Sequence, residues 1–234
     1  MEYRLTTPCT AQDLAPLKAG DTVLLSGVVY TARDQAHKRM MEALDKGETL
    51  PFDLEGSAIY YVGPTPERPG EVIGSAGPTT SGRMDAMSPR LLDLGNKIMI
   101  GKGKRDAAVK AAVVRNGAVY LAALGGAGAL MAKSVQTLEV IAWPDLGCEA
   151  VRRLTVQDMP LTVVLDAHGG DLYEARPCGL SGHTVRPKRR ELHPLHKTGV
   201  VQNRQNSSSV QKNMVSLTKL AANYLHQPQK CDIL

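Results

Sequence analysis

One turn of the chain, residues 77–85, concentrates side chains that can bind an anion. These are Thr79, Thr80, Ser81 and Arg83. An apolar, strand-like run over 71–76 precedes the turn, and apolar residues at a spacing of three to four follow it from Met84 to Leu94, so we predict a strand-to-helix junction. Backbone N–H groups, hydroxyl donors and a fixed positive charge at such a junction suit an anion. A helix cap supplied by one of the hydroxyls explains the turn alone equally well.

Two more cations stand where a predicted strand ends. The apolar segment 21–30 predicts a buried strand, followed by a helix that Thr31 can cap and that carries Arg33 in its first turn. A cation is disfavoured at that end of a helix unless an anion is brought there. A second strand at 97–101 breaks into Lys102, whose flanking glycines allow a ligand to approach the backbone closely. Both cations are candidate anion contacts, although solvent-exposed basic residues would explain them too.

The elements that must position these residues alternate between strands and helices. Further strands are predicted at 58–62, 112–115, 118–123, 138–143, 150–156 and 161–166. Asn116-Gly117 predicts a hairpin between the second and third of these. The glycine-rich segment 125–128 begins a helix, but its spacing matches no nucleotide-binding loop and favours close packing of helix on sheet. The fold class is therefore α/β, with a mixed sheet and flanking helices.

The strand-to-helix turns of an open mixed sheet gather at one edge, which is where ligands bind in α/β folds. Arg33, Arg83 and Lys102 are expected to converge at that edge, together with Thr79. Because each guanidinium can hold one carboxylate with two parallel hydrogen bonds, this set of cations suits a dicarboxylate. His168 follows the last predicted strand and is expected to be exposed and not catalytic.

Composition places a boundary near Pro177. The 234 residues are 43% hydrophobic, which is enough for a real core, and they carry a net charge of +5. From Cys178 onward nine Lys or Arg stand against two acidic residues, so 1–177 is predicted to be the folded domain and 178–234 a basic, polar tail that is disordered unless bound. An altered reading frame or gene end would also explain the tail.

The sequence also limits the class of protein. No apolar run approaches the roughly 20 residues that span a bilayer, and the N-terminus lacks a signal-peptide core, so a soluble, cytoplasmic protein without membrane partners is expected. The four cysteines are widely separated, which predicts neither a zinc site nor a disulfide framework. Any metal chemistry is expected to come largely from outside this chain.

Several motifs, in order, resemble one family. They are the segments 31–37, 61–66, 77–85 and 100–103, and the closing pattern from Leu138 to Tyr173. The sequence is similar over about residues 1–177 to the β subunit of iron-sulfur-dependent hydro-lyases, the class I fumarate hydratases and L(+)-tartrate dehydratases. This β subunit is equivalent to the C-terminal domain of the fused enzymes.

The resemblance implies a swivelling β/β/α domain that closes over a [4Fe-4S] cluster held by three cysteines of a separate α subunit. One iron of that cluster acts as a Lewis acid in the reversible hydration of a C4 dicarboxylate. Carried over by motif, the residues that bind the substrate carboxylates would be Arg33, Arg83 and Lys102. Thr79 would lie beside the carbon that loses its proton and would act with a carboxylate of the α subunit, because a threonine hydroxyl is a poor base alone.

The supporting residues of such a site would be His37 and Thr80. This chain, without the α subunit, would have no hydro-lyase activity, and its sequence does not distinguish fumarate or malate from tartrate. The main alternative is a non-catalytic domain of the same fold that binds a partner or nucleic acid through its basic tail. A fold-competent but inactive product with a displaced C-terminus is a third alternative.

Overall fold

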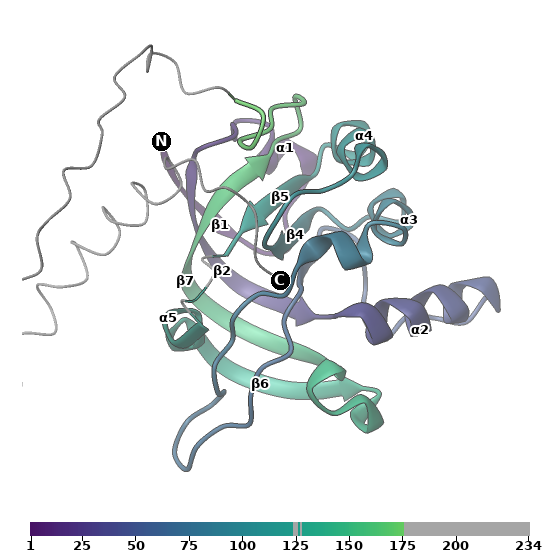
Figure 1. Ribbon diagram of the computed structural model, residues 1–234, viewed down its shortest axis with the longest axis vertical. Helices are drawn as coiled ribbons and strands as arrows, with labels where there is room; N and C mark the ends of the chain where they lie inside the picture. The colour runs from purple at the N-terminus through teal and green to yellow at the C-terminus, as the bar shows by residue number, and fades with distance from the viewer. Residues whose placement is uncertain (124–125, 127, 176–234) are drawn as a thin grey trace, which may run out of the picture. The chain divides into compact units, whose positions relative to one another are not determined.

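A computed structural model describes residues 1–123, 126 and 128–175 of the chain (Figure 1). The predicted basic tail and part of the glycine-rich turn at 125–128 lie outside the described residues. The described part is built on one mixed sheet of seven strands in the order β1-β2-β3-β4-β5-β7-β6. The strands are β1 (Glu2–Thr6), β2 (Thr22–Thr31), β3 (Ala58–Tyr60), β4 (Ile98–Gly101), β5 (Val119–Ala122), β6 (Val135–Ala142) and β7 (Val151–Leu165).

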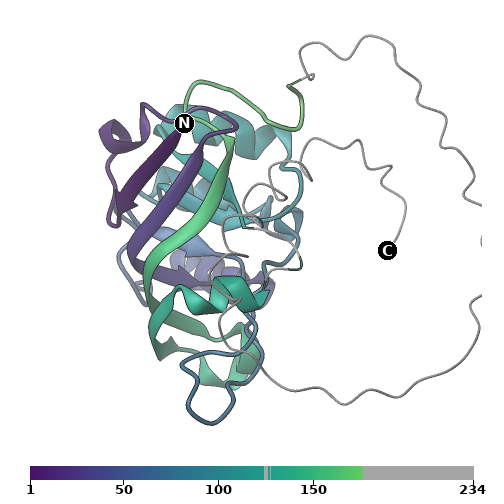
Figure 2. The same ribbon diagram turned by 90° about the vertical axis from the view of Figure 1, so that its left-hand side faces the viewer.

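The sheet closes on itself because β7 pairs with two strands that are not neighbours of each other. Strands β1 to β5 run parallel, whereas β7 runs antiparallel to β2, β5 and β6. Within β7, the stretch from Arg152 to Thr162 pairs with β2 and the stretch from Thr162 to Leu165 pairs with β5. Strands β2, β3, β4, β5 and β7 therefore form a closed ring, and Figure 2 shows β1, β2 and β7 side by side.

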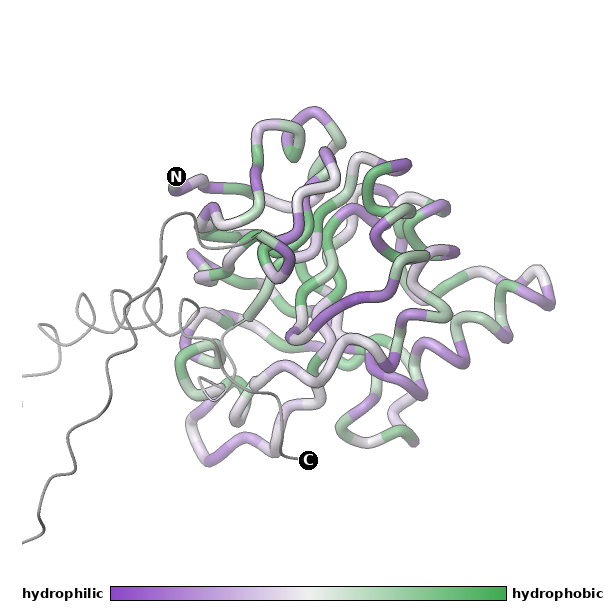
Figure 3. The backbone as a smooth tube through the Cα atoms, turned by 45° about the horizontal axis from the view of Figure 1, so that its top comes forward, coloured by the Kyte–Doolittle hydropathy of each residue, from purple (hydrophilic) through white to green (hydrophobic). Residues whose placement is uncertain are grey.

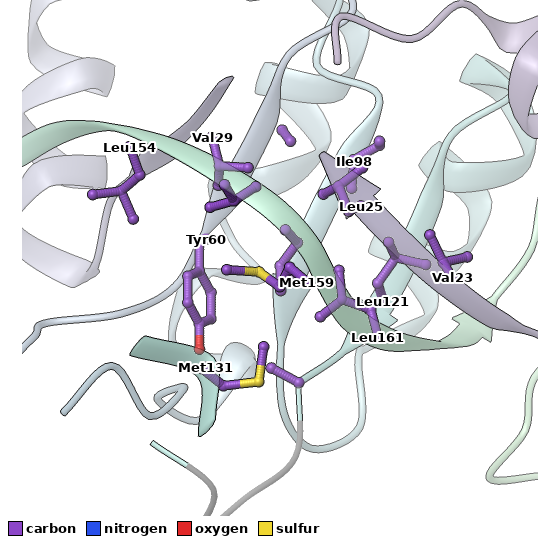
Figure 4. Close-up of a cluster of buried hydrophobic side chains, with 14 of the residues drawn as sticks. Val23, Leu25, Val29, Tyr60, Ile98, Leu121, Met131, Leu154, Met159 and Leu161 are labelled. Carbon is purple, nitrogen blue, oxygen red and sulfur yellow. The ribbon is translucent and has the colours of Figure 1, made fainter. Parts of the chain in front are cut away.

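Two apolar clusters lie on the two sides of this ring. The inner cluster takes alternate residues of the strands, such as Leu25, Ile98 and Leu121, and includes Met131 of α5 (Gly128–Lys133) (Figure 4). Side chains that alternate along a strand point to opposite faces, so the intervening residues face outward. Figure 3 shows hydrophobic stretches gathered in the middle of the described residues and hydrophilic stretches toward the outside.

The outward-facing residues are covered by helices. The helices are α1 (Ala11–Leu14), α2 (Asp34–Asp45), α3 (Ser88–Asp93), α4 (Ala107–Asn116) and α5, and two 3-10 helices span Ser81–Met84 and Pro144–Glu149. The outer cluster joins apolar residues of α2, α3 and α4 to Ile59, Met99 and Tyr120 of the strands. Figure 1 shows α2, α3 and α4 on one side of the strands. The mixed sheet with flanking helices confirms the predicted α/β fold class.

Three predicted elements were wrong. Segment 112–115 belongs to α4 and is not a strand, because Val109, Ala112 and Val113 are buried at helical spacing against the outer face of the sheet. The predicted hairpin at Asn116 is the end of this helix, where Gly117 adopts the left-handed conformation at φ 58°. Segment 71–76 lies in a loop and forms no strand.

The strands predicted at 150–156 and 161–166 are one continuous strand, β7. Asp158 lies between the two predicted segments and adopts φ 48° where the pairing with β2 shifts its register, and its N–H donates to Ser26 Oγ at 3.0 Å. Pro160 faces Leu24 within the same strand pair. A bulge therefore accommodates the residues between the two predicted segments.

Gly101, the last residue of β4, gives a test of this packing. A Cβ at this position would overlap Ser81 Oγ and would lie 2.9 Å from Tyr61 Cδ2, so Gly101→Ala should lower the free energy of unfolding by about 1–3 kcal/mol. Urea denaturation monitored by circular dichroism measures this change. Gly82→Ala is the control, because the nearest atoms would lie 3.9 Å from its Cβ. Equal stability of the two variants would contradict the close approach.

Candidate functional site

The parallel register of β2 to β4 brings the predicted turns to one edge of the sheet. The turn at 77–85 is joined to the turn after β4 by a bridge between Thr80 and Lys102. Ser81 N donates to the Lys102 carbonyl at 2.9 Å, and Lys102 N donates to Ser81 Oγ at 3.0 Å. The backbone of the turn at 77–85, the hydroxyl turn, is therefore fixed to the backbone of Lys102, whose side chain is exposed.

Each hydroxyl of the turn has a different environment. Thr79 is half-buried, and its N–H donates to the Tyr61 carbonyl at 2.8 Å. Thr80 is exposed and occupies the N-cap position of the short 3-10 helix, but its side chain makes no capping hydrogen bond. Ser81 is buried and lies 2.9 Å from the Tyr120 hydroxyl. Ser81 thus fastens the turn to the sheet, while Thr79 and Thr80 face outward to different degrees.

Arg33 stands at the N-cap position of α2 and not in its first turn as predicted. Thr31 does not cap this helix, because it is the last residue of β2 and its hydroxyl bonds to the backbone of Ala150 and Arg152. The Arg33 guanidinium lies against Gly63, where a Cβ would come within 2.8 Å of Nη1. Gly63 therefore leaves the room that Arg33 needs beside the chain.

Two carboxylates hold the arginines of the site. Arg33 Nη2 lies 3.4 Å from Glu149 Oε1, and Arg33 Nε lies 4.0 Å from Asp34 Oδ1. Arg83 Nη1 lies 3.8 Å from Asp34 Oδ2, so Asp34 stands between both guanidiniums. The structure thus brings Arg33 and Arg83 together, and it brings Lys102 to the same turn that carries Arg83.

His37 supports the backbone of Arg33 and not its guanidinium. The ring is fully buried, and Nδ1 lies 2.9 Å from the Arg33 carbonyl, so Nδ1 carries the proton and donates it to that oxygen. Burial, with a smaller contribution from the charge of Arg105, lowers the pKa of His37 to about 4. His37 is therefore neutral at pH 7 and fixes the carbonyl from which α2 starts.

Arg105 was missed by the sequence analysis. Its side chain is fully buried between the rings of Tyr61 and Tyr120, at 5.4 and 5.0 Å from their centroids. Nε donates to Asp85 Oδ1 at 2.6 Å, and Nη2 donates to Ser88 Oγ at 2.8 Å. Arg105 therefore ties Asp85, the end of the hydroxyl turn, to the segment that follows β4.

Nothing in the sequence separates Arg105 from the exposed Lys102 and Lys104 beside it. Asp34 and Glu149 were missed as well. Asp34 lies inside the motif at 31–37, which could have drawn attention to it, whereas Glu149 is 114 residues from the helix it contacts and leaves no local signal.

Comparison with known proteins shows the family of this chain. Residues 1–176 match the family described as Fumarase C-terminus. This chain belongs to that family. The predicted resemblance to hydro-lyase β subunits is thereby confirmed. The relatives of this chain are named as fumarate hydratases and tartrate dehydratases, both of which are hydro-lyases.

Two kinds of relative are found. The chain is 42% identical over 180 residues to a putative L(+)-tartrate dehydratase subunit beta of Methanocaldococcus jannaschii, covering 74% of this chain and 92% of that protein. It is 33% identical to the L(+)-tartrate dehydratase subunit beta of Escherichia coli, covering 74% and 87%. It is 40% identical to fumarate hydratase 2 of Leishmania major, covering 69% of this chain but only 29% of that protein. The chain thus spans most of a β subunit and less than a third of a fumarate hydratase.

Within the described ranges, 1–123, 126 and 128–175, no group of three or more His, Cys, Asp or Glu side chains could hold a metal ion. None of the helices described there is long and apolar enough to cross a membrane.

The buried His37 predicts a loss of stability in acid. The unfolded chain takes up a proton below about pH 6.5, whereas the folded chain resists protonation down to about pH 4, so the free energy of unfolding falls as pH falls through this window. The expected loss from this residue between pH 7 and pH 5 is about 2 kcal/mol, measured by urea denaturation. His37→Asn, which can still donate to the Arg33 carbonyl, should remove this component.

His168→Gln is the matched control for the pH experiment, because His168 is exposed. This variant should keep the pH dependence of the unmodified chain. A His37→Asn variant with the same pH dependence as the unmodified chain would contradict the assignment of a neutral, buried His37.

Proposed function

We propose that this chain is the β subunit of a [4Fe-4S]-dependent hydro-lyase that catalyses the reversible hydration of a C4 dicarboxylate. The observation that carries the proposal is the meeting of Arg33 and Arg83 around Asp34, on a turn joined to Lys102. The family relationship supports the class of reaction, and the match to nearly complete β subunits supports a heteromer with an α subunit.

The proposed cofactor belongs to the partner and not to this chain. When bound there, the cluster supplies a Lewis acid for the hydroxyl that is added or removed. The guanidinium, ammonium and hydroxyl groups that this chain presents at the site fit the substrate and not a metal ion, and the two carboxylates there, Asp34 and Glu149, are paired with the arginines. The chain is therefore proposed to be inactive without the α subunit, and its cytoplasmic location stays a prediction.

The proposed binding step uses the three cations of the site. Arg33 and Arg83 each hold a substrate carboxylate, and Lys102 adds a third positive charge from the neighbouring turn. Guanidinium groups suit this role because their paired N–H donors match the two oxygens of a carboxylate. Closing the partner over the site would exclude water and strengthen these contacts.

Thr79 is proposed to take part in removing the proton from the substrate carbon. It is half-buried, and its position is fixed by the bond of its N–H to the Tyr61 carbonyl. A hydroxyl removes a proton from carbon only when another base accepts its own proton, so a carboxylate of the α subunit completes the step. Thr80 is exposed and its side chain makes no capping hydrogen bond, and it is proposed to support the site as a second hydroxyl beside Thr79.

Anaerobic reconstitution with a cluster-bearing α subunit tests the proposal. Fumarate formation from malate and oxaloacetate formation from tartrate would be followed separately, and activity should need both chains. Lack of activity in a complex that still forms would contradict these substrates. Failure of the chains to associate would favour the non-catalytic interaction domain.

Substitutions in the reconstituted enzyme should separate binding from chemistry. Arg83→Ala should lower kcat/KM about 10- to 100-fold, because one charge-assisted carboxylate contact is lost. Thr79→Val should lower kcat about 100-fold or more with a smaller effect on KM. Arg90→Ala is the control, since Arg90 pairs with Asp45 and is placed outside the site. Unchanged activity of the Thr79 variant would remove this residue from the mechanism.

A further inference from the structure

Glu149 occupies an unusual position between a loop and the start of a helix. It ends the 3-10 helix Pro144–Glu149, and its side chain is 18% exposed. Oε1 lies 3.4 Å from Arg33 Nη2, and Oε2 accepts a hydrogen bond from Gln35 N at 3.0 Å. One carboxylate therefore contacts both the guanidinium that is proposed to bind substrate and a first-turn N–H of α2.

The start of α2 has no cap of its own. Arg33 at the N-cap position makes no side-chain hydrogen bond to the helix. The first N–H groups of a helix have no partner within it and carry a partial positive charge, which attracts an anion. Glu149 fills that position from 114 residues away in the sequence.

The pairing around Arg33 is incomplete. Glu149 and Asp34 balance the charges of Arg33 and Arg83, but at 3.4 to 4.0 Å these are loose contacts. Arg33 Nε and Asp34 Oδ1 are buried, and within the described residues neither has a hydrogen-bond partner. The guanidinium therefore keeps a donor that Glu149 does not use.

We propose that the Glu149 carboxylate competes with a substrate carboxylate for Arg33 and thereby limits the affinity of the site for its ligand. The inference rests on the proposed function, since it takes Arg33 as a substrate contact. A ligand carboxylate that binds Arg33 must displace Glu149, so the cost of this displacement lowers the affinity. A ligand with one carboxylate can bind Arg83 and leave Glu149 in place, whereas a ligand that uses both arginines always meets the competition.

Asp34 is less suited to this role. It is the first residue of α2, so its carboxylate is fixed beside the arginines by the helix itself. Glu149 reaches Arg33 from a different element, so it can withdraw without moving α2. Glu149→Gln tests the role well, because a glutamine keeps the acceptor for Gln35 N and loses only the negative charge.

Titration calorimetry of the full 234-residue chain with succinate and butyrate provides the measurement. These probes share a four-carbon length and differ in one carboxylate. Glu149→Gln should bind succinate about tenfold more tightly than the unmodified chain, and butyrate affinity should rise by no more than this factor, because butyrate can bind Arg83 alone. Glu149→Met, which also removes the charge, should show the same gain in succinate affinity.

Glu139→Gln controls for the loss of one negative charge. Glu139 is exposed and lies 3.9 Å from Arg153 on the neighbouring strand, away from Arg33. Its succinate affinity should stay within about twofold of the unmodified chain, as expected for an exposed ion pair. An equal gain of affinity in Glu139→Gln would overturn the proposal, because the effect would then reflect net charge.

Arg33→Ala separates the inference from the function on which it rests. If Arg33→Ala weakens succinate binding while Glu149→Gln leaves it unchanged or weakens it, only the role of Glu149 is overturned. Succinate binding that Arg33→Ala leaves unchanged would overturn Arg33 as a substrate contact, and the inference with it. If neither the unmodified chain nor any variant binds succinate, Glu149→Gln included, both the role of Arg33 and the role of Glu149 are overturned.

Discussion

The pairing of β7 with both β2 and β5 is the constraint on which the rest of the structure depends. It closes five strands into a ring, so the parallel strands β2 to β5 cannot slide relative to one another without breaking pairs on both sides. A fixed register also fixes where each strand ends. The residues that follow β2 and β4, Arg33 and Lys102, therefore lie at one edge as a result of the same closure that encloses the inner core.

A buried polar network fixes the hydroxyl turn to the closed sheet. Ser81 bonds to Tyr120 of β5, and Arg105 bonds to Asp85 while it lies between the rings of Tyr120 and of Tyr61, the residue after β3. Asp85 Oδ2 also accepts from Asp106 N at the start of α4. Buried polar groups of this kind hold a backbone in place only when each has a partner, because an unpaired buried charge costs far more than a pair gains.

The sequence was informative where the signal is local. Strand ends followed by Arg33, by the hydroxyl turn and by Lys102 could be found from short apolar runs and the residue types after them. The strand predicted at 112–115 was wrong, since the alanines and valines of α4 fit the spacing of a strand as well as that of a helix, and Asn116-Gly117 is as common at a helix end as in a hairpin. Glu149 and Arg105 could not be found, because their roles come from contacts made by residues far apart in sequence and from burial.

The arginines of this chain show how one residue type serves two purposes. Arg105 is fully buried, and its carboxylate partner, Asp85, is 2.6 Å away and itself only 12% exposed, so the pair is part of the core. Arg33 and Arg83 keep 20% and 54% of their side chains exposed and meet carboxylates only at 3.4 to 4.0 Å. A tight, buried pair could not exchange its partner for a ligand without stranding a charge. The loose, partly exposed pairs can, and this difference in pairing supports the proposal that Arg33 and Arg83, and not Arg105, contact the substrate.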